Sequence, residues 1–366
     1  MVISIHSDNP EATKIVRQLC TLCLQHRAEW HPELQINICN GEMSLSLPKH
    51  SLGELIRIPT HLFIPISEAQ WIPSPDTLIL GQADGRTSPL QRELIRLQIN
   101  LYNATNKLAC WSNRNPLSTL VSQPALCTQL LHLKPSYKSL ISSANAAEGF
   151  LRTRGLHWVG PPPFENGTTV LLPIVDFLNH HQGGAGFTIS DHGLSVTVAQ
   201  PTNTTECFAH YGGSRDTLEL ALNYGYFDMS TEIANSLYIE LRGRDSAKVI
   251  VGDNCRLGAT HSERAPLLKA AKNSIWISHF QWQHHRPQME MIARLLFEAS
   301  LKRAGRGREE SHLYSKGLVR SIAIANIREY RSMLEILENS SSNRCEVLEL
   351  AIKRQVEIIS SCSHTY

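Results

Sequence analysis

Residues 170–181 read Val-Leu-Leu-Pro-Ile-Val-Asp-Phe-Leu-Asn-His-His. The apolar, β-branched first half is typical of a buried strand, which ends abruptly on Asp176, Asn179 and two histidines. Taken alone, such a cluster favours a hydrogen-bonded corner, because Asp and Asn are common turn residues. A metal site is the alternative, although no pair of histidines at helical spacing accompanies the cluster.

Residues 206–227 form a second stretch with chemical potential, Glu-Cys-Phe-Ala-His-Tyr-Gly-Gly-Ser-Arg-Asp-Thr-Leu-Glu-Leu-Ala-Leu-Asn-Tyr-Gly-Tyr-Phe. The order predicts a strand, a glycine turn, a short helix and a stop. Asp216 can cap the helix with Glu219 three residues on, and Gly225 suits the left-handed turn at its end. Tyr211 and Tyr224 bracket this helix, and taken alone they are ordinary core aromatics.

Strand-forming residues surround both stretches. Alternating patterns predict strands at 34–39, 43–47, 54–65, 168–175, 194–199, 206–211 and 237–241. Between the early and late strands, apolar residues recur at helical spacing from residue 88 to about 157. The sequence therefore predicts a β-fold that is interrupted by a helical insertion.

After about residue 264 the pattern becomes almost wholly helical, with predicted helices at 265–279, 288–303, 318–338 and 345–360. The expected fold class is α+β. A catalytic domain is expected at 1–245, with its insertion at about 88–157, followed by an all-helical C-terminal domain at 246–366. A chain of 366 residues with 42% hydrophobic content is long enough to fill two cores.

Charge and composition narrow the class of partner. Thirty-five Lys and Arg face 33 Asp and Glu, so the formal charge is +2 and no nucleic-acid partner is expected. No stretch approaches about 20 uninterrupted apolar residues, and no charged leader precedes an apolar run, so we expect a soluble, cytoplasmic protein without a membrane partner. Nine scattered cysteines fit a reducing compartment. Cys20 and Cys23 fall on a helical apolar stripe, which favours packing over zinc binding.

Taken together, the two stretches resemble the SET-domain protein methyltransferases, in particular the subclass of the Rubisco large-subunit lysine methyltransferase and the actin histidine methyltransferase. Residues 172–180 look like the strand that leads into that subclass's Asn-His pair. Residues 211–227 look like its tyrosine-helix-tyrosine segment, with matching spacing between the two tyrosines. The resemblance implies a SET-type β-fold and a C-terminal helical domain that docks a protein substrate.

The resemblance also implies a cofactor, S-adenosylmethionine, and a set of site residues. The residues implied to bind the cofactor are Asn179, His180, Arg154 and Gly41. Tyr211 would be the catalytic tyrosine, and Asp176 and Tyr224 would line the pocket for the acceptor.

Methyl transfer from a sulfonium to an amine is an in-line displacement, so the protein must mainly align donor and acceptor and exclude water. A tyrosine hydroxyl and carbonyl oxygens can orient a polarised methyl without competing as nucleophiles. The acceptor must be neutral. Deprotonating a lysine of pKa about 10.4 near pH 7 costs about 4.6 kcal/mol, whereas a histidine of pKa about 6.5 is already mostly neutral.

A lysine acceptor is the leading expectation. Leu156 stands where the actin histidine enzyme has an asparagine that orients its substrate, which weakens the first alternative, a histidine methyltransferase. The second alternative is a non-catalytic SET-like scaffold, because Met43 stands where the family's cofactor turn has its second glycine. The third is a metal hydrolase, which would leave the two tyrosines unexplained and would use Asp176, His180, His181 and His210.

Overall fold

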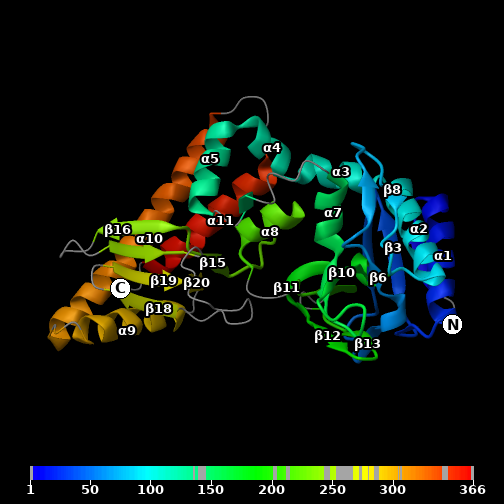
Figure 1. The fold of residues 1–366 in the computed structure, drawn as a ribbon, viewed down its shortest axis with the longest axis horizontal. Coiled ribbons are helices and arrows are strands. Elements are labelled where there is room, and N and C mark those ends of the chain that lie inside the picture. The colour runs from blue at the N-terminus through cyan, green and yellow to red at the C-terminus, as the bar shows by residue number, and fades with distance from the viewer. Residues whose placement is uncertain are drawn as a thin grey trace. The chain divides into compact units, whose positions relative to one another are not determined.

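The computed structural model describes residues 3–134, 137–138, 146–200, 204–211, 215–242, 248–252, 267–271, 274–278, 280–283, 288–303, 305, 307–339 and 345–363. The contacts between residues divide the chain into two compact units. The residues of each unit can be found in Figure 1 from the colour bar, which runs along the chain by residue number. The first unit comprises Met1–Asn113 and Ser143–Gly212, and the second comprises Arg114–Ser142 and Gly213–Tyr366. None of the helices in the described ranges is both long enough and apolar enough to cross a membrane.

The first unit is built on small β-sheets. Its five-stranded sheet has the order β1 (Ser4–Ser7), β3 (Gln35–Cys39), β4 (Glu42–Ser46), β14 (Glu206–Ala209) and β11 (Asn179–Ala185). A second sheet has the order β12 (Phe187–Ser190), β13 (Gly193–Thr197), β5 (Glu54–Pro59) and β2 (Glu29–Trp30). A third has the order β6 (Ile64–Pro65), β10 (Thr168–Leu171) and β9 (Leu156–Trp158), and β7 (Gln70–Ile72) pairs with β8 (Ile79–Gln82). These sheets confirm the predicted split of the strands into an early and a late group.

Four α-helices accompany these sheets in the described residues: α1 (Pro10–Gln25), α2 (Pro89–Ala104), α3 (Lys107–Arg114, whose last residue is assigned to the second unit) and α7 (Ala146–Arg154). Short 3₁₀ helices form at η1 (Thr60–Leu62) and η3 (Val175–Phe177). Helices α1 and α2 lie side by side in Figure 1. The side chain of Asn9 caps α1, and a Ser88–Gln91 capping box starts α2.

The predicted packing role of the two N-terminal cysteines is confirmed. Cys20 and Cys23 both lie on the buried face of α1 with Leu19. Burial raises the pKa of the Cys20 thiol to about 12, and it raises that of Cys23 further. Both groups therefore behave as small apolar side chains at neutral pH.

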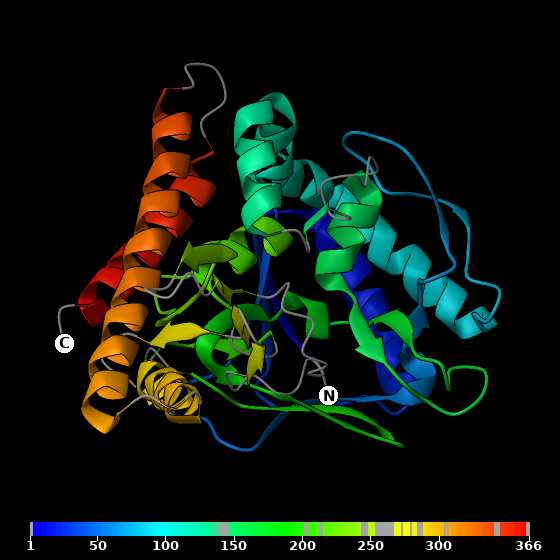
Figure 2. The ribbon, with the colours of Figure 1, turned by 60° about the vertical axis from the view of Figure 1, so that its left-hand side comes forward.

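The second unit combines helices with two small sheets. Its helices in the described residues are α4 (Leu117–Ser122), α5 (Pro124–Leu133), α8 (Thr217–Tyr224), α9 (Gln288–Arg303), α10 (Arg308–Glu338) and α11 (Glu346–Ser363). One sheet has the order β16 (Ile239–Arg242), β17 (Lys248–Val251), β19 (Ser274–Ser278) and β18 (Leu267–Ala271), and β15 (Ile233–Asn235) pairs with β20 (Gln281–Gln283). The long helices α10 and α11 pack against each other (Figure 2).

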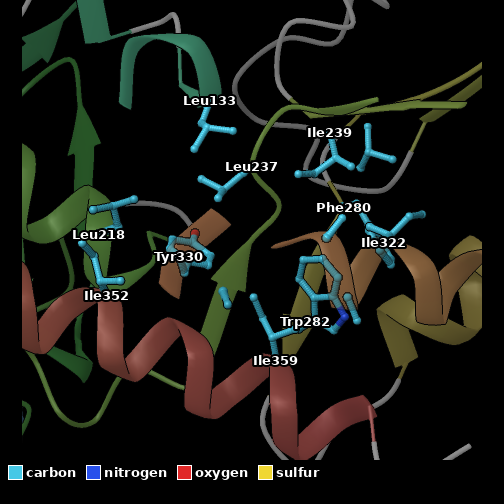
Figure 3. Close-up of a cluster of buried hydrophobic side chains, with 14 of the residues drawn as sticks. Leu133, Leu218, Leu237, Ile239, Phe280, Trp282, Ile322, Tyr330, Ile352 and Ile359 are labelled. Atoms are coloured by element: carbon cyan, nitrogen blue, oxygen red, sulfur yellow. The ribbon is translucent and has the colours of Figure 1, made fainter. Parts of the chain in front are cut away.

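A single hydrophobic cluster holds the second unit together. Figure 3 shows Trp282 of β20 with Ile322 of α10 and Ile359 of α11 around it. Leu133 of α5 belongs to the same cluster. The middle of the helical insertion is therefore packed into the core of the second unit, because α5 buries its apolar side chains there.

The expectation of an all-helical C-terminal domain is wrong. Helix α9 has the predicted bounds, α11 nearly so, and α10 begins at Arg308, ten residues before its predicted start, but β17, β18, β19 and β20 precede all three. The described residues of the predicted helix 265–279 form β18 and β19. Residues 274–278 read Ser-Ile-Trp-Ile-Ser, and this alternation of β-branched side chains buries Ile277 against the core while β19 pairs with both β17 and β18. The contacts also divide the chain elsewhere than at residue 245, because residues 213–245 belong to the second unit.

Candidate active site

The two chemically suggestive stretches meet at adjoining strands of the first unit. Strand β11 pairs in parallel with β14, so that Asn179 lies opposite Phe208 and His180 opposite Ala209. Tyr211 follows the end of β14 by two residues. Residues that lie 31 positions apart in the sequence are thereby brought into direct contact.

Tyr211 is held at both ends by the segment 178–180. Its main-chain N–H donates to Nδ1 of His180 at 3.0 Å, and its hydroxyl donates to the carbonyl oxygen of Leu178 at 2.6 Å. The two rings lie with their centroids 5.1 Å apart. The tyrosine ring is therefore fixed in direction as well as in place.

The hydrogen bond from Tyr211 also assigns the protonation of His180. A nitrogen that accepts a hydrogen bond from a main-chain N–H carries no proton, so neutral His180 has its proton on Nε2. Its side chain is buried, and the ring of His210 lies 5.4 Å away. His180 thus contributes an oriented imidazole at the junction of the two strands.

Asn179 joins three strands through its side-chain amide. Its Nδ2 donates to Oε1 of Glu206 at 2.8 Å and to the carbonyl oxygen of Met43 at 3.4 Å. The Met43 side chain is buried, in alternation with the neighbouring residues of β4. Met43 is therefore part of the hydrophobic core of the first unit.

Asp176 and Arg154 form the second half of the site. Asp176 lies in η3, and Arg154 is the last residue of α7. The Arg154 guanidinium donates through Nη1 to Oδ1 and to the main-chain oxygen of Asp176, both at 3.4 Å. The other carboxylate oxygen of Asp176 accepts a hydrogen bond from the hydroxyl of Tyr102 at 2.6 Å. The end of the insertion is thus tied to the turn that leads into β11.

Burial and charge act in opposite directions on this pair. Burial raises the pKa of Asp176 above its ordinary value, although Arg154 and the Tyr102 hydroxyl favour its charged form. Burial lowers the pKa of Arg154, but the negative charge of Asp176 and its hydrogen bond to the guanidinium favour the cation, so that the net pKa is raised. Arg154 therefore remains a cation, and Tyr211 lies within the range of its charge.

Gly41 occupies a turn that packs against the end of α2. Its φ is +79°, and a Cβ atom at this position would lie 2.5 Å from the carbonyl oxygen of Thr105. The next residue, Glu42, forms an ion pair with Lys107 at the start of α3. Burial lowers the pKa of Lys107, and the nearby charge of Arg154 lowers it further. Gly41 is thus required by packing within the protein, because the space beside it is filled by main chain.

Tyr224 belongs to the second unit and ends α8. The predicted capping box of Asp216 and Glu219 is present, and Gly225 ends the helix in the left-handed conformation, with φ of +64°. The guanidinium of Arg215 lies 5.5 Å from the centre of the Tyr224 ring. Burial raises the pKa of Tyr224. The glycine turn at 212–214 lies outside the described residues.

Arg154 was predicted from the sequence as a site residue of the insertion, but Gln98 and Tyr102 of α2 were not. Gln98 donates to the Tyr102 hydroxyl at 2.9 Å, and Tyr102 in turn reaches Asp176. A signal was present, because Gln98 and Tyr102 lie four residues apart on the same face of α2 as Leu94. A buried polar residue on an apolar stripe indicates a hydrogen-bond partner elsewhere in the fold. Across the described ranges, no group of three or more His, Cys, Asp or Glu side chains is arranged to hold a metal ion.

Comparison of the sequence with protein families and curated proteins does not identify this site. No protein-family model matches the sequence, and no curated protein matches it significantly.

Proposed function

We propose that this protein is an S-adenosylmethionine-dependent methyltransferase that modifies a lysine side chain of a protein substrate. The observation that carries the proposal is the pair of oxygens formed by the Tyr211 hydroxyl and the Leu178 carbonyl, which lie 2.6 Å apart beside His180. Both are oxygen atoms of the kind that orients a polarised methyl group. Tyr211 is held rigidly, as alignment of a displacement reaction requires.

The residues of the first unit fit such a cofactor at two places. The hydroxyl of Tyr211 and the carbonyl of Leu178 supply acceptor oxygens for a methyl carbon that carries partial positive charge. Arg154 supplies a cation for a carboxylate, and its Nε is buried without a hydrogen-bond partner among the described residues. When bound, the cofactor would supply the electrophilic methyl group.

The protein's own residues would hold the methyl donor and align it with the acceptor. Tyr211 would fix the direction of approach, and Arg154 together with Asn179 and His180 would hold the donor. Gly41 supports the turn before β4 and, packed on Thr105, does not offer open space to a ligand. The second unit would dock the protein substrate, and by resemblance Asp176 of the first unit would face the acceptor.

A lysine acceptor agrees with the residue at position 156. Leu156 lies in β9, opposite Val170, and it has no amide with which to orient an imidazole. Because a lysine is charged at neutral pH, the protein must favour its neutral form in the complex. A histidine acceptor would instead require a group that fixes its tautomer.

Titration with S-adenosylmethionine in a calorimeter is the first test. We expect binding by the wild-type protein, and binding of similar strength by the Tyr211→Phe variant. The absence of both heat and thermal stabilisation at millimolar ligand would reject the proposal and favour a non-catalytic scaffold.

Transfer is tested with methyl-labelled S-adenosylmethionine and a protein extract as the acceptor mixture. We expect label on lysine for the wild-type protein, near-complete loss for Tyr211→Phe, and wild-type transfer for the control Tyr238→Phe, whose hydroxyl contacts surface Glu240 in the second unit. Mass spectrometry of the labelled residue separates lysine from histidine. Full activity of Tyr211→Phe would exclude the proposed role of Tyr211.

A further inference from the structure

Tyr102 stands in the middle of a directed chain of hydrogen bonds. Nε2 of Gln98 donates to the Tyr102 oxygen at 2.9 Å, and the Tyr102 hydroxyl donates to Oδ2 of Asp176 at 2.6 Å. Gln98 and Tyr102 are each 1% exposed. An amide nitrogen can only donate, so the Tyr102 oxygen accepts from Gln98 and its own hydrogen is directed at Asp176.

The same carboxylate holds Arg154. Nη1 of Arg154 donates to both Oδ1 and the main-chain oxygen of Asp176. Because Tyr102 holds Oδ2, both carboxylate oxygens of Asp176 are fixed. The Arg154 guanidinium also lies over the Phe150 ring at 5.2 Å, and that ring meets Tyr102 edge-on. Nε of Arg154 remains without a hydrogen-bond partner in the described part of the chain.

We infer that Tyr102 is a positioning residue for Arg154: its hydroxyl fixes the Asp176 carboxylate, which in turn fixes the guanidinium with Nε left for a ligand. The inference rests on the proposed function, in which Arg154 contacts the cofactor. It adds Tyr102 of α2 to the part that the helical insertion plays in ligand binding through Arg154. Tyr102 itself acts only through Asp176.

The Tyr102→Phe substitution keeps the contact of the ring with Phe150 and removes only the hydroxyl, with its hydrogen bonds to Gln98 and Asp176. One buried oxygen of Asp176 then loses its donor, which disfavours the carboxylate. The other groups that face Asp176 are the cations Arg154 and Lys107, and Lys107 is itself paired with Glu42. Loss of the Tyr102 donor therefore raises the pKa of Asp176 above its already raised wild-type value.

The first experiment compares S-adenosylmethionine affinity across pH for the wild-type, Tyr102→Phe and Tyr330→Phe proteins. Tyr330 is the matched control, because its buried hydroxyl is bonded to Asn235 in the second unit. We expect Tyr102→Phe to bind about tenfold more weakly at neutral pH, as the loss of one directed hydrogen bond would give. The loss of affinity on acidification should also begin at higher pH in Tyr102→Phe than in wild type, whereas a purely structural defect would weaken binding equally at all pH values.

The second experiment follows Asp176 without any ligand. Carboxyl carbons of labelled aspartate are titrated by NMR, and the Asp176 signal is assigned by its absence in Asp176→Asn. We expect the Asp176 signal of Tyr102→Phe to titrate at higher pH than that of wild type. Gln98→Met removes only the hydrogen bond from Gln98 to Tyr102, so we expect it to shift the Asp176 titration in the same direction but by less. This variant takes the place of Tyr102→Phe if Tyr102→Phe does not fold.

The outcomes separate the two proposals. If the wild-type protein binds no S-adenosylmethionine, the proposed function fails, and the Asp176 titration alone decides the role of Tyr102. If the wild-type protein binds the cofactor but Tyr102→Phe has an unchanged affinity, pH profile or Asp176 titration, the positioning role is overturned and the proposed function stands.

Discussion

The main-chain N–H of Tyr211 donates a hydrogen bond to Nδ1 of His180, and the two rings lie 5.1 Å apart. This hydrogen bond holds the His180 imidazole in one tautomer and the main chain of Tyr211 in place. The Tyr211 hydroxyl is held separately, by its hydrogen bond to the Leu178 carbonyl. This contact joins two stretches of the chain whose chemistry neither stretch reveals alone.

His180→Ala should destabilise the first unit. The substitution removes a buried ring and leaves the Tyr211 N–H without its acceptor, so we expect a loss of about 2–3 kcal/mol in the free energy of unfolding. The neighbouring His181→Ala is the control, because His181 is only partly buried and its hydrogen bond to the Gly183 N–H is exposed. Chemical denaturation of both variants measures the difference, and equal losses would contradict the structural role of His180.

Gly41→Ala should cost more than an alanine at other glycines of the first unit. Gly41 combines a left-handed φ with a close approach to the Thr105 carbonyl. Gly53 has a left-handed φ of +103°, but a Cβ atom there would meet no neighbour. Gly85 has neither a left-handed φ nor a neighbour that a Cβ atom would meet. We expect a loss of about 2–3 kcal/mol for Gly41→Ala, about 1 kcal/mol for Gly53→Ala and little change for Gly85→Ala. Thermal and urea unfolding test this order, which would be wrong if Gly41→Ala were as stable as Gly85→Ala.

Asp84 should make stability depend on pH. Burial alone raises the pKa of Asp84, but hydrogen bonds from Arg86 and from the main-chain N–H of Glu68 outweigh burial, so that the net pKa is lowered. A lowered carboxyl pKa stabilises the fold above the pKa of the unfolded chain, near its ordinary value of about 3.9, and this contribution is lost as the pH falls through the folded value.

Asp84→Asn is therefore expected to cost about 2 kcal/mol at pH 7 and much less near pH 3. Glu93→Gln is the control, because its pair with Arg96 is exposed and contributes little. Unfolding measured at the two pH values tests the sign, and a difference between wild type and Asp84→Asn that grows on acidification would refute it.

Gln355→Leu should weaken the second unit. Gln355 is fully buried in α11, and its Nε2 donates to the Thr217 hydroxyl at 2.6 Å at the start of α8. Leucine keeps the volume but leaves the Thr217 oxygen without this donor, for a cost of about 1–3 kcal/mol. The control Gln129→Leu removes hydrogen bonds of 3.3 and 3.5 Å to Glu329 and should cost less than about 1 kcal/mol. Similar losses in denaturant titrations would count against a special role of the buried bond.

Elements that depend on neighbours in the sequence were predictable. The capping box of Asp216 and Glu219 and the stop at Gly225 specify α8 because each acts within one helical turn. Likewise, the alternation in 35–39 gives β3, and the helical stripe gives α1 with Cys20 and Cys23 inside. Asn179, His180 and Tyr211 were proposed as candidates from the resemblance, and the structure brings them together.

Other elements were decided by contacts over long distances. Residues 267–271 and 274–278 pair as strands, because β19 gains partners on both sides. The middle of the insertion, at α5, buries Leu133 in the core of the second unit. The burial of Leu133 is not encoded in the local period of side chains, and the short alternation at 274–278 specifies a strand only together with pairing partners that lie in distant segments.

The sequence by itself determined the caps, the helical and strand periods, and the polar clusters at strand ends, because these act between residues a few positions apart. Only the tertiary structure decided that Tyr211 is hydrogen-bonded to Leu178 and His180. It also decided that Tyr102 of the insertion is hydrogen-bonded to Asp176, 74 positions further along the sequence. The physical reason is that a buried polar group must find its partner wherever the folded chain brings one, and that place depends on the packing of the whole unit.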